Sequence, residues 1–221
     1  GYDGTPVKVL PIPIADSILS AAPLPESKEV DDGLPVIGSW SDDIFVFLVI
    51  FDFHSTELRK NPSGPIRAFL AAFPNGDSGR KSRLVVKALN PFFNADTTKK
   101  FRDLQLLANG DERIVFMTEH LSDLAVAKLA RRANCYVALH RGEDYGINAI
   151  ESMALGIPVI ATNYSATVDF FSAVSSQWGI CHFPIPYERV IITNASVSRP
   201  SENGIMMPEP RHDSAVRPMQ K

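Results

Sequence analysis

Two acidic residues that lie eight positions apart, Glu143 and Glu151, are the strongest candidates for chemistry in this sequence. The residues between them predict a turn and then a helix over 146–155, which Gly156 closes. Glu151 falls on a side of this helix that also carries Ile147, Ile150, Ala154 and Leu155. A helix that is apolar on most sides is normally buried, so we expect Glu151 to be paired or hydrogen-bonded, because burying a lone carboxylate is very unfavourable.

The turn that carries Glu143 is also a predicted anion site. Its free N–H groups adjoin the N-terminus of the helix, and both features attract negative charge. The sequence therefore predicts one acid at the mouth of an anion pocket and a second acid deeper along the helix. The alternative is that Glu143 is a solvated turn residue and that Glu151 is a structural acid with its own partners.

The cationic pair Arg59–Lys60 is a second candidate group. It follows a predicted strand over 44–51, so it shares the carboxyl edge of the predicted sheet with Glu143. Positive charge is disfavoured at the start of a helix, and a helix is predicted from Pro62. A bound anion would resolve this conflict, whereas the alternative is two solvated surface cations.

Strands and helices alternate along the chain with short connections. The strand 44–51 is apolar without alternation, as expected when both faces of a parallel strand are covered. This pattern predicts an α/β fold with a doubly wound, Rossmann-like parallel sheet, in which ligands bind at the carboxyl ends of the strands. The other expected strands are 84–89, 113–117, 135–139, 158–161 and a last one within 179–185, and the expected helices are 62–73, 96–108, 123–133 and 146–155.

Three regions are expected along the chain. Residues 1–42 are an extension or linker rich in Pro, Asp and Ser, in which 7–14 can form one short strand that its prolines confine to a sheet edge. Residues 43–186 form the doubly wound domain. Residues 187–221 are expected to be an irregular tail without an evident final helix.

Composition sets the broad class. The 221 residues are 45% hydrophobic and carry a formal net charge of −3, which suits one globular domain with extensions and gives no electrostatic case for a nucleic-acid or membrane-surface partner. No apolar run approaches the ~20 residues of a transmembrane helix, and the first residues do not form a signal peptide. The two cysteines, Cys135 and Cys181, make no disulfide framework. We therefore expect reduced thiols in a cytoplasmic protein.

Other reactive constellations are missing from the sequence. There is no Ser/His/Asp arrangement and no His/Cys spacing of a metal site, so no metal is expected. His140 ends a predicted strand beside the candidate site. Two roles stay open for it, because it can orient Glu143 or cap the turn.

The stretch from Ala138 to Phe170 carries a family resemblance. Glu143 and Glu151 form an E-x7-E pattern, set among Glu-Asp-Tyr-Gly, Glu-Ser-Met-Ala-Leu-Gly and Pro-Val-Ile-Ala-Thr-Asn. This stretch resembles the C-terminal, donor-binding domain of a retaining glycosyltransferase of the GT-B, group 1 type. The resemblance implies that the sheet is one half of a GT-B fold, and that region 43–186 is a nucleotide-sugar-binding domain.

The resemblance also implies roles for individual residues. Lys60 matches a lysine that grips the donor diphosphate, while the family's arginine position is occupied here by His54 or Ser55, for which Arg59 is the candidate substitute. Glu143 would hold hydroxyls of the transferred sugar, and Glu151 would bind the nucleotide ribose. The implied catalytic residues are Glu143 and Lys60, and the implied donor-binding residues are Arg59, Tyr145, Gly146, Ile147, Asn148 and Glu151.

The implied activity is transfer of a sugar from a nucleotide-diphosphate sugar to a sugar or glycan acceptor, with retention and without cofactor or metal. The acceptor-binding N-terminal domain of a GT-B enzyme is missing from the sequence, so the chain is expected to be inactive alone. A catalytically degenerate nucleotide-binding or interaction module of the same fold is the main alternative. A GT-B sugar-nucleotide epimerase is a third.

Overall fold

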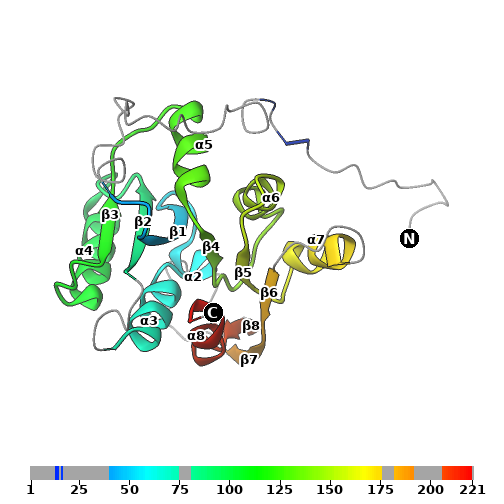
Figure 1. Ribbon diagram of the computed structural model, residues 1–221. Coiled ribbons are helices and arrows are strands. Elements are labelled where there is room, and N and C mark those ends of the chain that lie inside the picture. The colour runs from blue at the N-terminus through cyan, green and yellow to red at the C-terminus, as the bar shows by residue number, and fades with distance from the viewer. Residues whose placement is uncertain are drawn as a thin grey trace.

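A six-stranded parallel sheet forms the centre of the protein (Figure 1). The structure is a computed structural model, and it describes residues 13–14, 16, 40–74, 81–175, 182–191 and 206–220. The strand order β3-β2-β1-β4-β5-β6 is that of a doubly wound, Rossmann-like fold. The strands are β1 (Phe45–Asp52), β2 (Ser82–Leu89), β3 (Ile114–Met117), β4 (Cys135–Ala138), β5 (Val159–Thr162) and β6 (His182–Ile185).

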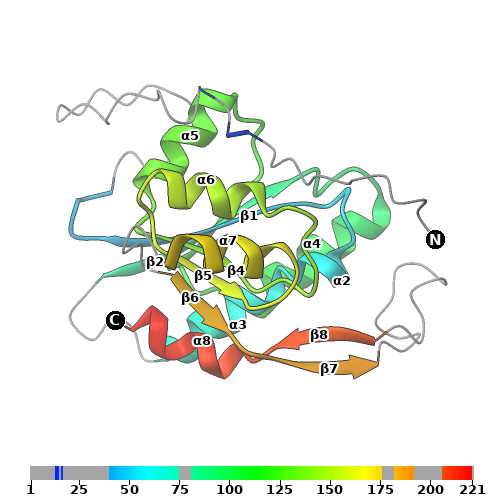
Figure 2. The ribbon, with the colours of Figure 1, turned by 90° about the vertical axis from the view of Figure 1, so that its right-hand side faces the viewer.

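Helices cover both faces of this sheet. Figure 2 shows α5 and α6 on one side of the sheet and α3 and α8 on the other. Two further strands, β7 (Tyr187–Ile191) and β8 (Met206–Pro210), form a separate antiparallel pair. The helices are α2 (Glu57–Lys60), α3 (Ser63–Ala72), α4 (Ala95–Ala108), α5 (Asp123–Arg132), α6 (Ile147–Ala154), α7 (Ala166–Ser175) and α8 (His212–Met219).

The central strand β1 is apolar without alternation because it is buried on both faces. Phe47, Val49 and Phe51 pack in the cluster that contains side chains of α3, α4 and α8. Val46 and Leu48 pack in the second cluster, with side chains of α5, α6 and α7. The expectation of a parallel strand with two covered faces is therefore confirmed.

The order of the strands reverses between β1 and β4, which are neighbours in the sheet. Asn134 joins the two strands, because its backbone N–H donates to the Val46 carbonyl at 2.8 Å and its side-chain oxygen accepts from the Val46 N–H at 2.8 Å. In a doubly wound sheet, the crevice for a ligand opens at the carboxyl ends of the strands at this switch point. The fold therefore points to the ends of β1 and β4 as the place to look for a site.

The strands and helices expected within residues 44–162 are present, with ends that differ by a few residues. The strand expected within 179–185 is confirmed over His182–Ile185, whereas 179–181, including Cys181, lie outside the described residues. Residues 7–12 of the expected edge strand also lie outside them, and Pro13 and Ile14 are in no strand. The boundaries 1–42 and 43–186 stay predictions.

The prediction of an irregular tail over 187–221 without a final helix is wrong for its described parts. The strands β7 and β8 pair from Tyr187–Pro210 to Ile191–Met206, and the helix α8 follows. The prolines hid this pattern, since Pro208 and Pro210 are tolerated in a two-stranded edge pair and Pro218 stands near the end of α8. Tertiary packing stabilises α8, whose Ala215 and Met219 are buried in the first core cluster.

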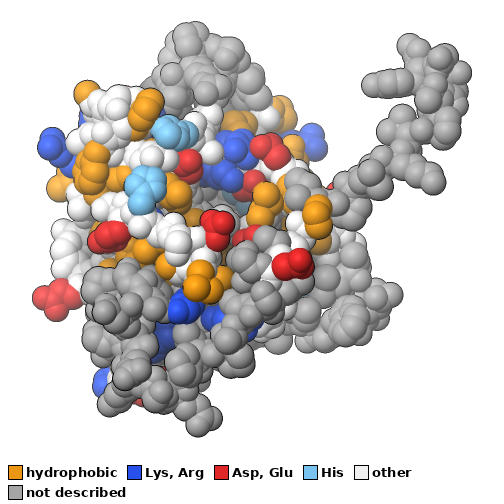
Figure 3. All heavy atoms as spheres, turned by 90° about the horizontal axis from the view of Figure 1, so that it is seen from above, with side chains coloured by type: hydrophobic (Ala, Val, Ile, Leu, Met, Phe, Trp, Pro, Cys, Tyr) orange, Lys and Arg blue, Asp and Glu red, His pale blue; other side chains and the backbone are white. Residues whose placement is uncertain are grey.

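The surface offers mixed charge. On the face shown in Figure 3, basic side chains lie among acidic ones near the middle, with hydrophobic side chains between and around them. In the ranges that the structure covers, no helix has the length and apolar character needed to cross a bilayer.

Candidate functional site

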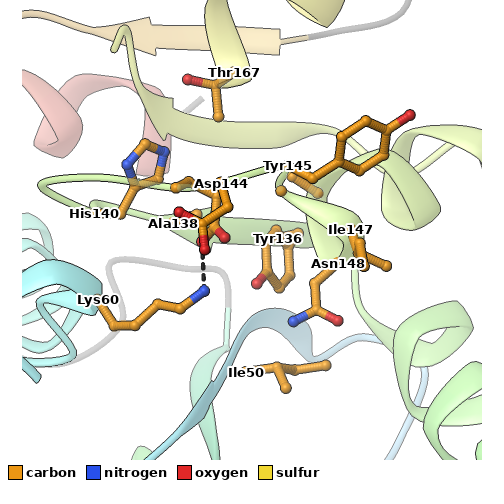
Figure 4. Close-up of a pocket in the computed structure, with 13 residues that line it drawn as sticks. Ile50, Lys60, Tyr136, Ala138, His140, Asp144, Tyr145, Ile147, Asn148 and Thr167 are labelled. Carbon is orange, nitrogen blue, oxygen red and sulfur yellow. Dashed lines mark hydrogen bonds and ion pairs between the residues drawn. The ribbon is translucent and has the colours of Figure 1, made fainter. Parts of the chain in front are cut away.

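A cavity of about 420 Å³ opens where the fold predicts a ligand site, at the carboxyl ends of β1 and β4 (Figure 4). Its floor is formed by Ile50 of β1 and by Tyr136 and Ala138 of β4. Lys60 reaches it from α2, residues 143–149 line it from the turn and the first residues of α6, and Thr167 of α7 completes it. Six residues of the predicted site thus share one cavity, namely Lys60, Glu143, Tyr145, Gly146, Ile147 and Asn148.

Lys60 and Glu143 form an ion pair in this cavity. The Lys60 Nζ donates to the Glu143 Oε2 at 2.6 Å, and the two side chains are 21% and 17% exposed. The dashed line from the Lys60 ammonium in Figure 4 marks this pair. The predicted cation and the predicted acid therefore neutralise each other in this structure.

The prediction that Arg59 and Lys60 stand at the start of a helix is wrong. Both residues belong to the last turn of α2, which ends before Asn61, a residue in the left-handed conformation with φ of 49°. Positive charge is favourable at a helix C-terminus, so the two cations need no bound anion there. The remaining candidate for an anion site is the N-terminus of α6.

Arg59 lies on the outer side of the acidic turn. Its Nη1 is 3.7 Å from the Glu143 Oε1 and 3.6 Å from the Asp144 Oδ2, and it donates to the Gly142 carbonyl at 3.3 Å. It is not among the residues that line the cavity. Arg59 therefore contacts the acid of the site from outside, whereas Lys60 contacts it from inside.

The N-terminus of α6 borders the cavity. Gly146 is the residue before the helix and has φ of 76°, a left-handed conformation that side chains rarely adopt. A Cβ at this position would also lie 3.2 Å from the Phe170 ring. The first-turn amides of a helix have no intrahelical acceptor, so Gly146, Ile147 and Asn148 place the positive end of the helix dipole at the cavity.

The main chain of Glu143 is held by hydrogen bonds from Ser165 and Ala166, at the start of α7. The Ser165 hydroxyl donates to the Glu143 carbonyl, and the Ala166 N–H donates to the same oxygen at 3.4 Å. Ser165 has φ of 65°, which turns the chain tightly into α7. This arrangement leaves the Glu143 carboxylate directed toward Lys60.

Tyr136 and Asn148 meet on the floor of the cavity. The Asn148 side chain interacts with the Tyr136 hydroxyl. Burial raises the pKa of this phenol, the Glu143 carboxylate adds to the rise, and the Asn148 side chain acts to lower it. The cavity therefore has a neutral polar floor below the charged pair at its mouth.

His140 is buried beside the charged pair and is 2% exposed. Neither ring nitrogen has a hydrogen-bond partner among the residues that the structure describes. The ring therefore neither orients Glu143 nor caps the turn through a hydrogen bond, and both expected roles are wrong for this structure. Its pKa is lowered to about 4, chiefly by burial; the Glu143 carboxylate acts to raise it, and Lys60 and Arg59 act to lower it. The ring lines the cavity as a neutral imidazole. Its lack of partners among the described residues is unusual, because most buried polar groups are hydrogen-bonded.

Glu151 lies outside the cavity lining, on the face of α6 that meets Pro13 and Ile14. It is half-buried, because α6 has an open side on which Ile147 is 48% exposed. Burial raises its pKa, and the Asp123 carboxylate adds to the rise. The expectation of a deeply buried acid is therefore wrong, although the acid does experience partial desolvation.

The sequence did not identify Ile50, Tyr136, Ala138 and Thr167 as residues of the site. Three of them belong to β1 and β4, whose adjacency depends on the strand order. The one local signal was the hydroxyl of Tyr136 within an otherwise apolar strand, since a buried phenol needs a partner.

Comparison with known proteins gives one family. The sequence pattern of the family described as "Glycosyl transferases group 1" matches residues 68–178, which is half of the chain. One curated relative is the lipopolysaccharide core biosynthesis mannosyltransferase LpsB of Rhizobium meliloti (strain 1021). The two are 32% identical over 69 residues, which are 31% of this chain and 19% of the relative.

Solved structures with the same fold are longer than this chain. WaaG, a glycosyltransferase involved in lipopolysaccharide biosynthesis, matches 96% of this chain and 48% of its own, with a TM-score of 0.60 and 19% identity. A glycosyltransferase from Rickettsia africae ESF-5 matches 77% of this chain and 40% of its own, with a TM-score of 0.55 and 17% identity. The chain thus has the fold of one half of a GT-B structure and spans less than half the length of each.

Proposed function

The chain belongs to the group 1 glycosyl transferases, and we propose that it is the part of such an enzyme that binds a nucleotide-diphosphate sugar. The observation that carries this proposal is the meeting of Lys60 and Glu143 at the mouth of the switch-point cavity, beside the N-terminus of α6. A cavity of about 420 Å³ falls within the range of small-molecule sites. The proposed reaction is sugar transfer to a sugar or glycan acceptor with retention at the anomeric carbon.

Stabilising the leaving group is the physical task of such a site. When the bond between sugar and diphosphate breaks, negative charge builds up on the diphosphate. Lys60 and the N–H groups of Gly146, Ile147 and Asn148 are placed to stabilise that charge. In this proposal, Lys60 exchanges the Glu143 carboxylate for the diphosphate when the donor binds.

The exchange releases Glu143 for the sugar. Its carboxylate then accepts hydrogen bonds from sugar hydroxyls and stabilises the positive charge that develops at the anomeric carbon. Arg59 continues to contact the carboxylate during the exchange, because its Nη1 lies 3.7 Å from the Glu143 Oε1 on the outer side of the turn. In this proposal, Arg59 therefore interacts with Glu143 and not with the diphosphate alone.

Tyr145 and Glu151 complete the proposed donor contacts. Tyr145 lines both the cavity and the small hollow beside Glu151, so the two residues share one side of α6. We assign Glu151 to the nucleotide ribose. Its raised pKa suits a group that hydrogen-bonds neutral hydroxyls.

We propose that the chain is one half of a two-domain enzyme. The 221 residues cover 48% of the WaaG chain, and a GT-B enzyme works in the cleft between two domains. We propose that the isolated chain binds donor weakly and transfers no sugar, that no metal or cofactor is needed, and that the enzyme is cytoplasmic. Sugar transfer by the isolated chain, or loss of donor binding on adding EDTA, would contradict these points.

Ligand-detected NMR against a panel of nucleotide sugars tests the proposal directly. Saturation transfer should select one donor, whose affinity calorimetry then measures for the wild-type chain and for Lys60→Ala and Glu151→Ala. Lys81→Ala is the matched control, because Lys81 is 60% exposed and pairs with Asp43 away from the cavity. Loss of binding in the first two variants but not in the control supports the donor site. A folded chain that binds no nucleotide would instead favour a degenerate interaction module.

A further inference from the structure

Arg141 joins the candidate site to Glu209 of the strand β8, which lies 68 positions further along the chain. Its guanidinium forms a forked pair with Glu209, in which Nε donates to Oε2 and Nη2 donates to Oε1 at 3.0 Å. The two side chains are 16% and 30% exposed. Such bidentate pairs hold both partners in one geometry.

The same arginine holds the end of α2. Its Nη1 donates to the Leu58 carbonyl at 2.8 Å, and its backbone N–H donates to the Arg59 carbonyl at 2.8 Å. The last carbonyls of a helix have no intrahelical donors. Arg141 therefore supplies donors to two carbonyls at the C-terminal end of the helix that carries Lys60.

The helix α2 depends on such external contacts. It has four residues, none of which is buried, and the Thr56 side chain does not cap its N-terminus. A helix this short has no stability of its own in water. Besides Arg141, the Asn61 amide anchors the segment by donating to the Leu139 carbonyl at 2.6 Å.

Arg141 also belongs to the turn that carries Glu143, two residues later. One side chain thus connects both members of the Lys60–Glu143 pair to β8. Neither Arg141 nor Glu209 is among the residues that line the cavity. A contribution of this pair to donor binding must therefore act through the placement of other residues.

We infer that Arg141 and Glu209 are positioning residues that set Lys60 relative to Glu143, and thereby the affinity for the donor diphosphate. The inference rests on the proposed function, because it takes Lys60 as the group that binds the diphosphate. It makes the β7–β8 pair a working part of the donor site, although no residue of these strands is among those that line the cavity.

The test is calorimetry of the 221-residue chain with UDP, GDP and ADP, at a temperature well below the melting transition of every variant. The variants are Arg141→Met, Glu209→Gln and the double variant. Arg211→Met and Glu188→Gln are the matched controls, because these two residues form an exposed pair at 4.0 Å next to the same strands. Deuterium uptake of residues 57–61 measures the placement of α2 without a ligand.

We expect Arg141→Met and Glu209→Gln each to weaken binding of the preferred diphosphate about tenfold and to speed exchange in 57–61, whereas the controls change affinity less than about twofold. The double variant should bind no worse than Arg141→Met, because the two residues act as one unit. Arg141→Lys, which keeps the charge but not the fork, should recover only part of the affinity.

Two results would overturn the inference and separate it from the proposed function. The first result is wild-type affinity in Arg141→Met and Glu209→Gln together with loss of binding in Lys60→Ala, which would support the donor site but contradict the positioning role. If these two variants then differ from the wild type only by a lower melting temperature, the pair has a structural role. If the wild-type chain binds none of the three diphosphates, the proposed function fails and this inference fails with it.

Discussion

The ammonium of Lys60 and the carboxylate of Glu143 stand 2.6 Å apart, although 83 positions separate the two residues in the chain. In the proposed function, donor binding is therefore an exchange of anions at Lys60 rather than the filling of a free cationic site. The measured affinity for a diphosphate reports how much better Lys60 interacts with the diphosphate than with Glu143. Variants of either residue test the two sides of that exchange separately.

Replacing Lys60 by alanine removes the group that we propose to stabilise the leaving diphosphate. We expect the intact, two-domain enzyme to lose about 2–4 kcal/mol of transition-state stabilisation, or roughly a hundredfold or more in kcat, by analogy with deleting one electrostatic donor. Steady-state kinetics with saturating donor measure the effect. Unchanged turnover in Lys60→Ala, with Lys81→Ala as the surface control, would remove Lys60 from the mechanism.

Replacing Glu143 by glutamine should separate diphosphate binding from sugar transfer. Partly exposed ion pairs are worth about 0.2–1 kcal/mol, so freeing Lys60 should tighten binding of the nucleoside diphosphate by a factor of about 1.4 to 5. The intact enzyme should at the same time lose most of its transfer rate. Calorimetry with the diphosphate alone checks the first effect, and Asp43→Asn controls for the change in net charge. Weaker binding in Glu143→Gln would show that no exchange takes place.

Replacing Gly146 by alanine tests the turn at the start of α6. The left-handed conformation disfavours any side chain by about 1–2 kcal/mol, and here the new Cβ would also meet Phe170 at 3.2 Å. Gly156, at the other end of the same helix, has φ of 77°, and a Cβ added there would have no atom within 4 Å. Urea unfolding should therefore show a larger loss of stability for Gly146→Ala than for Gly156→Ala. Equal losses of stability in the two variants would show that the Phe170 ring moves away from the new Cβ at no cost in free energy.

His140 should make the chain sensitive to acid. Burial lowers its pKa to about 4 in the folded chain, from 6.5 when it is exposed. Between these values the unfolded chain binds a proton that the folded chain does not, so the free energy of unfolding falls as the pH falls. The contribution is complete above pH 6.5 and is lost toward pH 4, to a total of about 3 kcal/mol at about 1.4 kcal/mol per pH unit.

Urea unfolding at a series of pH values between about 7 and 4 measures this loss. His140→Leu should show a shallower fall in stability than the wild type over the window, while His120→Gln, at an exposed position, should follow the wild type. Parallel curves for His140→Leu and the wild type would show that other groups account for the acid sensitivity.

The elements of the sheet could be predicted because each carries a local signal. The apolar run 44–51 and the capped helix after Ser122 are typical cases, and the Ser122 hydroxyl indeed accepts from the Ala125 N–H at 3.2 Å. The helix α2 carries no such signal, since its stability comes from Arg141 and Asn61. Missing α2 also produced the wrong dipole argument for Arg59 and Lys60.

The candidate site was predictable in part for the same reason. Glu143, Lys60 and the turn before α6 follow strands, so their shared edge could be inferred from the alternation alone. The places of Ile50 and Tyr136 in the cavity could not be predicted, because they depend on the adjacency of β1 and β4, which no local sequence pattern indicates. The forked pair of Arg141 with Glu209 required the path of β8, where prolines conceal the strand.

The contact between Val46 and Asn134 spans 88 positions of the chain. During synthesis on the ribosome, one edge of β1 therefore has no native neighbour until β4 has been made and released from the exit tunnel. Such late pairing slows folding and leaves an apolar strand exposed in the meantime. The floor of the cavity, which joins Ile50 of β1 to Tyr136 and Ala138 of β4, can therefore form in a newly made chain only after β4 has emerged.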